Sequence, residues 1–208
     1  MFIVTYRKIF YALSVLIFIA SIGALSVWGL NLGIDFKGGS LMEVSFATSS
    51  PVTSTQIESA IAPLNYESTV RTGGNGFLIR MKTLTETERQ TVVSKLETID
   101  KGVTVNRFTS IGPVLGKEAA SKSLWAIALV LVCIVLFVAF VFRKVSEPIS
   151  SWKYGLITIV ALAHDVLVPA GVFAYLGHYQ GVQVDTLFVT ALLVVLGFSV
   201  HDTIVVFD

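Results

Sequence analysis

Two aspartates lie inside long apolar stretches of this 208-residue sequence, where a carboxyl group is costly. Asp165 lies in the stretch ALAHDVLVPAG, and Asp202 lies in GFSVHDTIVVFD. A charged acid at the centre of a membrane helix costs about 2.5–3.5 kcal/mol, and such residues usually face a bundle interior and mark a path for protons, ions or substrates. We therefore predict that both aspartates bind and release protons. The alternative is that each is a protonated acid that hydrogen-bonds neighbouring helices together.

Each aspartate follows a histidine, which gives the pairs His164-Asp165 and His201-Asp202. Histidine titrates near neutral pH, as a proton relay requires. Adjacent residues on a helix point about 100° apart, so the members of a pair need not contact each other, although they can share one polar cavity. A second interpretation of the histidines stays open, in which each donates to a backbone carbonyl across a helix contact.

Pro169 adds to the case for Asp165. A proline inside a helix leaves the carbonyl four residues before it without a hydrogen-bond donor, and that carbonyl belongs to Asp165. A free carbonyl at membrane depth is satisfied by a neighbouring side chain or by water. We therefore expect a helix kink and a hydrated site on the turn that carries Asp165, although many membrane helices tolerate proline without any mechanism.

These residues must be positioned by membrane helices, because the composition is not that of a soluble protein. Hydrophobic residues make up 54% of the chain and charged residues 14%, against about 25% charged in typical soluble proteins. The mean hydropathy is +0.78. A helix needs about 20 apolar residues to cross a hydrocarbon core of about 30 Å. The charge-poor stretches predict four such helices, within residues 1–30, 123–142, 154–177 and 186–208.

Basic residues near the helix ends predict the orientation. Arg7 and Lys8 precede the first helix, and the loop 143–153 holds three basic residues, whereas the loop 178–185 holds none. The positive-inside rule then places the N-terminus and the loop 143–153 in the cytoplasm. The loop 178–185 and the long polar block 31–122 lie on the opposite, periplasmic side in this prediction.

The polar block 31–122 has the pattern of a small folded domain. Two helix starts carry capping-box pairs, Thr53 with Gln56 and Thr85 with Glu88. Alternating or apolar runs predict four strands, at 41–46, 66–72, 77–82 and 103–108, with a hairpin turn at 73–76. The resulting order β-α-β-β-α-β predicts an α+β, ferredoxin-like domain inserted in a membrane α-helical bundle.

Glycines gather where this block joins the first two helices. We predict hinges over Asn31–Ser40 and Ile111–Lys122, because glycine permits backbone angles that other residues avoid. Ordinary junction loops are the alternative. The glycines concerned are Gly33, Gly38, Gly39, Gly112 and Gly116.

Several other classes of function lack support. Cys133 is the one cysteine and there are three histidines, so the sequence favours neither a disulfide nor a metal site. The segment Gly112–Glu118 has three residues between its glycines where a phosphate loop has four. A net charge of +1 does not indicate a nucleic-acid partner. We expect no enzyme and no cofactor. The available energy source is the proton gradient, worth about 2.3 kcal/mol per charge per 100 mV.

Four motifs resemble those of the SecF family of protein-export membrane proteins, within the resistance-nodulation-division superfamily. Residues 31–39 resemble its Gly-[Leu/Ile]-Asp-Phe-x-Gly-Gly signature, and residues 110–118 resemble the junction before its second helix. Residues 161–166 and 200–208 resemble its third- and fourth-helix motifs. The signature residues are Gly33, Asp35, Phe36, Gly38 and Gly39, followed by Gly112, Pro113 and Gly116.

The resemblance implies more than the residues do. SecF works with SecD beside the SecYEG channel in the bacterial inner membrane, with YajC and YidC as further candidate partners. The pair uses the proton-motive force to promote translocation and release of the unfolded exported polypeptide. The family's fourth-helix acid, which Asp202 matches, is regarded as a proton-pathway residue. The family has six spans, so we expect this sequence to be truncated after the fourth and to lack an arginine that pairs with that acid.

Two other functions stay open. One is a proton-driven transporter of the resistance-nodulation class that moves a lipid or small molecule, which would require a larger outer domain than residues 31–122 provide. The other is a membrane scaffold in which the acids only hold helices together. A scaffold predicts that Asp202→Asn is harmless, because an amide still hydrogen-bonds.

Overall fold

The computed structural model describes residues 5–47, 52–74, 76–142 and 151–207, with side chains left out at 151–154 and 206–207. The chain forms two compact units. The first comprises residues 1–32 and 121–208 and is called the membrane unit below; the second comprises residues 33–120 and is called the small unit.

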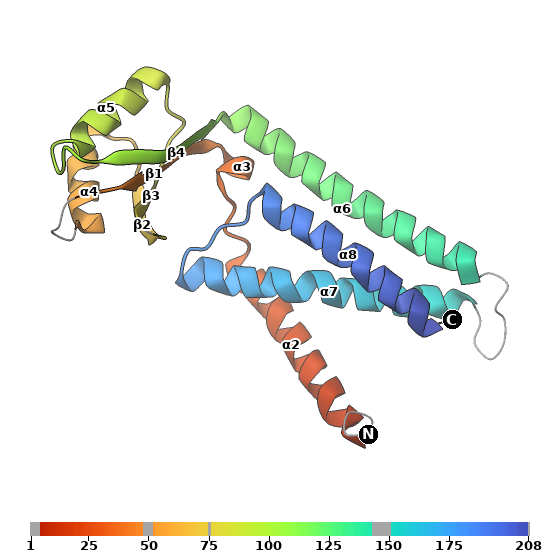
Figure 1. The fold of residues 1–208 in the computed structure, drawn as a ribbon. Helices are drawn as coiled ribbons and strands as arrows, with labels where there is room; N and C mark the ends of the chain where they lie inside the picture. The colour runs from red at the N-terminus through yellow and green to blue at the C-terminus, as the bar shows by residue number, and fades with distance from the viewer. Residues whose placement is uncertain (1–4, 48–51, 75, 143–150, 208) are drawn as a thin grey trace. The chain divides into compact units, whose positions relative to one another are not determined.

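The membrane unit is built from long apolar helices (Figure 1). In the described part of the chain, four helices are long and apolar enough to cross a membrane, so the chain is a multi-pass membrane protein. They are α2 (Arg7–Trp28), α6 (Pro113–Val141), α7 (Ser151–Tyr179) and α8 (Thr186–Phe207). Large apolar side chains on these helices face outward, for example Trp125, Leu129 and Phe198, which are 64–74% exposed, as expected of surfaces whose solvent is lipid.

The prediction of a hinge loop over Ile111–Lys122 is wrong from Pro113 onward. Helix α6 begins at Pro113 and continues without interruption to Val141. Proline is well suited to the first helical position, because its fixed φ fits and its missing N–H is not needed there. The sequence prediction locates a membrane span by its lack of charged residues. Because Lys117 and Lys122 are charged, the predicted span begins later than the helix does. Residues Asn31–Ser40 also include a one-turn helix, α3 (Ile34–Lys37), and the start of a strand.

Helix α7 contains Pro169 and runs through it as one helix. It starts at Ser151, so the last residues of the predicted loop 143–153 are helical, and residues 143–150, with Arg143 and Lys144, lie outside the described part. Helices α2 and α7 approach very closely at Gly171, where a Cβ atom would lie 2.4 Å from Ser21 Cα. That glycine is therefore required by helix packing.

The end of α2 is fastened to the loop between α7 and α8. The Asn31 amide donates to the carbonyls of Gly181 and Val182 at 3.3 and 3.2 Å, and the Asn31 carbonyl accepts from Val184 N at 2.8 Å. The Trp28 ring stacks on His178 with centroids 5.0 Å apart. These contacts fix the end of α2 against α7 and against the loop that precedes α8. At the other end of the membrane unit, α6, α7 and α8 share an apolar core of Val138, Phe142, Leu162, Leu196 and Val200.

In its described residues, the small unit contains a four-stranded antiparallel sheet covered by the helices α4 (Ser54–Ile61) and α5 (Glu86–Leu96). The one-turn helix α3, the short 3₁₀ helix η1 (Ala62–Leu64) and the start of α6 also belong to this unit. The strand order is β2-β3-β1-β4. Strand β2 starts three residues later than expected, because Asn65 and Glu67 have positive φ angles of 54° and 45°, which a strand does not accommodate. The strands are β1 (Gly39–Ser45), β2 (Thr69–Gly73), β3 (Gly76–Met81) and β4 (Thr104–Ile111).

Local signals in the small unit are confirmed. Thr53 and Gln56 form a capping box at α4, and Thr85 and Glu88 form one at α5. Strands β2 and β3 meet in a tight hairpin with Gly73 opposite Gly76. The two helices and the sheet enclose one core, whose fully buried members are Met42, Val44, Ile57, Ile61, Ile79, Val92 and Leu96.

Candidate functional site

Asp165 lies in the middle of α7 and bonds to a neighbouring helix. The Ser199 hydroxyl of α8 donates to Asp165 Oδ2 at 2.5 Å. His164 Nδ1 lies 3.1 Å from Asp165 Oδ1, so the adjacent histidine does reach its aspartate. The two side chains are only about one-third exposed, at 36% and 34%. The carboxyl group is thus held by two partners within the membrane unit.

The other ring nitrogen of His164 reaches α2. His164 Nε2 lies 2.9 Å from the Ser14 hydroxyl, and the Phe18 ring stacks on the imidazole with centroids 5.8 Å apart. Ser14, His164, Asp165 and Ser199 therefore form one continuous hydrogen-bonded chain, called the polar chain below. It connects three helices, since α7 supplies both central residues and α2 and α8 supply one hydroxyl each.

The geometry lets the polar chain hold a proton in more than one place. In a neutral imidazole, Nδ1–H donates to Asp165 and Nε2 accepts from Ser14. In an imidazolium both nitrogens donate, so Ser14 must turn its oxygen toward the ring. A proton on Asp165 instead turns the acid into a donor. Each state keeps the groups hydrogen-bonded, which matters because an unsatisfied polar group in hydrocarbon costs several kcal/mol.

The second histidine–aspartate pair lies in different surroundings. His201 and Asp202 are 77% and 86% exposed, and His201 Nδ1 lies 3.7 Å from Asp202 Oδ1. No hydrogen bond joins this pair to Asp165 in the part of the chain that the structure describes. The role of Asp202 in a proton pathway stays a prediction. Nor do the described residues include a group of three or more His, Cys, Asp or Glu that could hold a metal ion.

The signature residues form a close-packed junction inside the small unit. A Cβ atom on Gly116 would lie 2.7 Å from Gly38 N, and one on Gly38 would lie 2.7 Å from Pro113 Cα. Gly38 and Gly39 also have positive φ angles of 79° and 126°. Phe36 is buried, Gly33 caps the helix α3 and Asp35 lies in its first turn. These residues, with Gly112 preceding α6, let the start of α6 pack against the backbone at 36–38, and none belongs to the polar chain.

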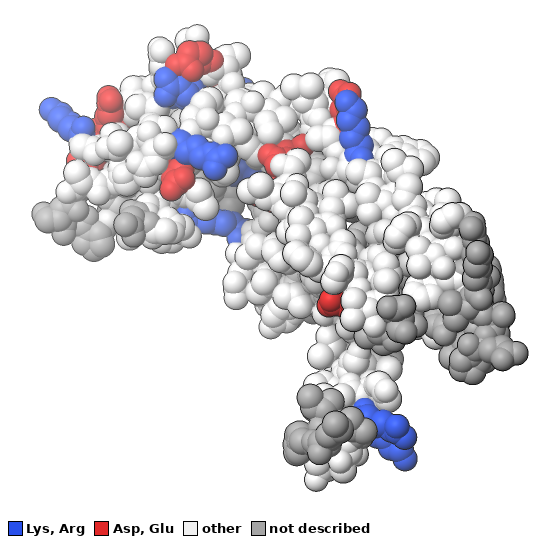
Figure 2. Space-filling view, turned by 45° about the vertical axis from the view of Figure 1, so that its right-hand side comes forward, with Lys and Arg blue, Asp and Glu red and all other residues white. Residues whose placement is uncertain are grey.

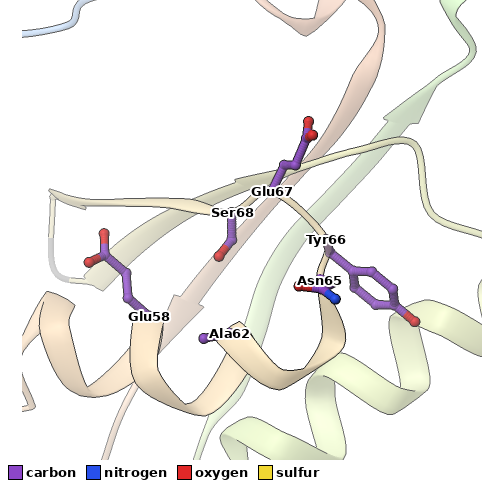
Figure 3. A pocket seen from close by; sticks show the side chains of 6 residues that line it. All are labelled: Glu58, Ala62, Asn65, Tyr66, Glu67 and Ser68. Atoms are coloured by element: carbon purple, nitrogen blue, oxygen red, sulfur yellow. The ribbon is translucent and has the colours of Figure 1, made fainter.

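A cavity of about 560 Å³ lies on the small unit beside the start of β2. Figure 3 shows Glu58 pointing from α4 toward the strand and Glu67 pointing the other way. The residues that line the cavity are Glu58, Ala62, Asn65, Tyr66, Glu67 and Ser68. Sequence reasoning did not single out this cavity.

Two members of the polar chain were missed as well. Ser14 and Ser199 are single hydroxyls in apolar helices, and their partners lie 150 and 34 residues away. A hydroxyl in a membrane helix commonly bonds its own backbone, as Ser26 does to the Ile22 carbonyl at 2.8 Å. The pairing is therefore visible only after the helices are placed together.

Sequence patterns of known families match most of the chain. The pattern described as "Protein export membrane protein SecD/SecF, C-terminal" matches residues 91–208, and the "SecD/SecF GG Motif" matches residues 23–49. The chain is 44% identical to the protein translocase subunit SecF of Thermobaculum terrenum, over 99% of this chain and 68% of that protein. It is 37% identical to SecF of Anaerolinea thermophila, over 97% and 66%. The chain thus spans about two thirds of these relatives.

A solved structure has the same fold. The crystal structure of SecDF, a translocon-associated membrane protein from Thermus thermophilus, matches 94% of this chain with a TM-score of 0.75 and 25% identity. The matched part is 26% of that chain. Together with the family patterns and the relatives above, this match shows that the chain belongs to the SecD/SecF family of protein-export membrane proteins.

Proposed function

We propose that this chain is a proton-coupled subunit of the Sec protein-export machinery, and not an enzyme. It acts with SecD beside SecYEG, with YajC and YidC as further candidates, and uses the proton-motive force to promote translocation and release of an unfolded polypeptide. The export role is supported by the similarity to SecF translocase subunits and to the translocon-associated SecDF. No cofactor is needed in this proposal.

The polar chain is the observation that carries proton coupling. A hydrogen-bonded acid, a histidine and two hydroxyls on three membrane helices are costly to place in lipid. Close packing at small residues, such as Gly171 against Ser21, holds helices together without this cost. Protonation of Asp165 changes what it offers Ser199 and His164, so proton uptake can bias the packing of α8 and α2 against α7.

The orientation and the small unit complete the proposal. Arg7 and Lys8 support a cytoplasmic N-terminus in the bacterial inner membrane. In this proposal the small unit is periplasmic and ferredoxin-like. The strand order β2-β3-β1-β4, with helices after β1 and β3, supports a split β-α-β arrangement. That position lets it contact a polypeptide that leaves the channel.

The test uses the full-length protein with SecD in proteoliposomes. Gradient-dependent release of a secreted protein is compared between wild type and Asp165→Asn, with the ATP-driven steps held constant. We expect the variant to assemble but to lose most of the gradient-dependent release, because an amide cannot exchange a proton. Asp165→Glu is the matched control and retains much of it. We expect Asp202→Asn to lose the gradient-dependent part as well.

Unchanged release in Asp165→Asn with normal assembly would contradict the role of the polar chain and favour a scaffold. Loss in Asp202→Asn alone would place the proton path at the exposed pair. Measuring proton uptake on the same vesicles separates a loss of coupling from a loss of contact with the exported chain.

A further inference from the structure

Strand β2 (Thr69–Gly73) is at the edge of the small unit's sheet, where, among the described residues, it pairs with β3 on one side only. An edge strand presents unpaired N–H and C=O groups that can accept another strand. The register shows which groups these are. In an antiparallel strand, the backbone N–H and C=O groups of successive residues alternate between bonding the neighbouring strand and pointing away from it.

The outward groups belong to Val70 and Thr72. The amide of Val70 donates to Glu58 Oε1 at 3.4 Å, so it points away from β3. Gly73 pairs with Gly76 and Arg71 pairs with Leu78, and these two pairs alternate with the pairs of Val70 and Thr72. By the same alternation, the backbone N–H and C=O of Thr72 also point away from β3, whereas those of Arg71 point toward β3. Thr72 has an exposed side chain.

Glu58 already imitates part of an added strand. Its carboxylate oxygen accepts from Val70 N, which is what a carbonyl oxygen of a neighbouring strand would do. The distance of 3.4 Å is beyond the usual 2.7–3.2 Å range, so this bond is weak and readily exchanged. A neighbouring strand would restore a full-strength bond and also reach the outward groups of Thr72.

The cavity beside β2 indicates which side chain an added strand would carry. Side chains of a strand alternate between the two faces of a sheet. Those on the α4 face would lie beside the cavity of about 560 Å³ that Glu58 helps to line (Figure 3). A carboxylate there favours Lys or Arg. Arg71 on the open face disfavours a second basic residue on that side, so the preference is confined to the α4 face.

We propose that β2 binds an extended polypeptide segment as an added strand, with a Lys or Arg side chain in the cavity at Glu58. This mode of recognition takes affinity from main-chain hydrogen bonds and specificity from alternate side chains. It suits an unfolded chain of varied sequence. The identity of the natural occupant, the exported polypeptide, rests on the proposed function; the binding itself does not.

The test uses the full chain in nanodiscs and a labelled ten-residue Thr/Val peptide with one central lysine. Binding is measured by fluorescence anisotropy without any proton gradient, so failure of proton coupling leaves it untouched. Thr72→Pro removes an outward N–H and leaves the pairing with β3 intact, as proline is tolerated on edge strands. We expect it to weaken binding about tenfold, and Thr72→Ala, which keeps the N–H, to stay within about twofold.

The charge is tested separately. A peptide with glutamate in place of the lysine should bind about fivefold more weakly to wild type, a difference that Glu58→Gln should remove. Hydrogen exchange should show the amides of Val70 and Thr72 protected by the lysine peptide. Equal binding by Thr72→Pro and Thr72→Ala would overturn the proposal. So would self-association that only Thr72→Pro abolishes and no peptide competes with, since the occupant would then be a second copy of this chain.

Discussion

In the small unit, apolar side chains such as Met42 and Ile79 fill the interior and charged side chains cover the outside. In the membrane unit the outer surface is apolar, and three of its helices are joined by the polar chain. Figure 2 shows the contrast on one face, where Lys, Arg, Asp and Glu gather over the small unit and the helix surfaces are almost free of them.

The difference follows from the solvent. Water drives apolar groups into the small unit's core, whereas lipid is as apolar as leucine and gives the helices no such drive. Helix association then depends on close packing and on hydrogen bonds. Both units nevertheless contain buried or half-buried hydroxyls that are hydrogen-bonded. In the small unit, buried Ser40 accepts from Leu84 N at 2.9 Å and donates to Ser110 at 2.8 Å.

The largest effect should come from a hole in the water-driven core. Ile79→Ala, at a fully buried position, should lower the free energy of unfolding of the small unit by about 2–5 kcal/mol. Leu129→Ala on α6 is the matched change at a position whose side chain is 64% exposed, where we expect about 0.5 kcal/mol or less. Pulse proteolysis in nanodiscs measures both. Similar losses would break the comparison between the two units.

Overpacking should damage the membrane unit next most. Gly171→Ala places a methyl group 2.4 Å from Ser21 Cα, so α2 and α7 must separate, at a cost of about 1–3 kcal/mol. Gly197→Ala on α8 meets no atom within 4 Å and should be neutral or stabilising, since alanine favours a helix by up to about 1 kcal/mol over glycine. Thermal unfolding in nanodiscs distinguishes the two. A loss of stability in both would indicate a general intolerance of larger residues.

A smaller effect is expected from one interhelical hydrogen bond. Ser14→Ala removes the α2 end of the polar chain, and such bonds in membranes average about 0.6 kcal/mol. Ser26→Ala, which removes only a bond to its own helix, is the control. The same thermal assay applies. If Ser14→Ala costs no more than Ser26→Ala, then the bond from Ser14 to His164 does not contribute to the packing of α2 against α7.

The smallest effect concerns an exposed ion pair of the small unit. Hydrogen bonds from Lys82 and then from Thr85 lower the pKa of Glu88 from 4.5 to about 2. The stabilisation from this depressed pKa is present above the ordinary value and is lost as pH falls from about 4.5 through about 2. Glu88→Gln can still form the capping box but should show a flatter loss of stability over that range. The test measures, at each pH, the urea concentration at which half of the protein becomes cleavable by pepsin, a protease that is active in acid. Equal slopes would assign the acid sensitivity to other carboxylates.

The sequence predicts what depends on neighbours a few residues apart. The capping pair of Thr85 and Glu88 is local, and the four spans follow from composition along each stretch. The start of α6 at Pro113 does not follow from a rule that ends a span at the first charged residue. Proline at a first helical position is the local signal that indicates this start. The importance of Asp165 is predicted from the free-energy cost of placing an acid in the membrane interior.

Ser14 and Ser199 could not be found in this way. Their significance depends on which helices lie side by side, and nothing local distinguishes them from Ser26. The exposure of Asp202, against the partial burial of Asp165, likewise follows from the packing of α7 and α8 and not from the similar His-Asp spacing of the two motifs.

The bond from Ser14 to His164 has a consequence for biosynthesis. The two residues are 150 positions apart, and at about 5–20 residues per second the ribosome needs roughly 8–30 s to make the chain between them. During that interval the Ser14 hydroxyl can bond the backbone of its own helix, as Ser26 does. When His164 is made, the hydroxyl that it bonds is already present in the chain. The order of synthesis therefore supplies the α2 end of the polar chain before its α7 centre.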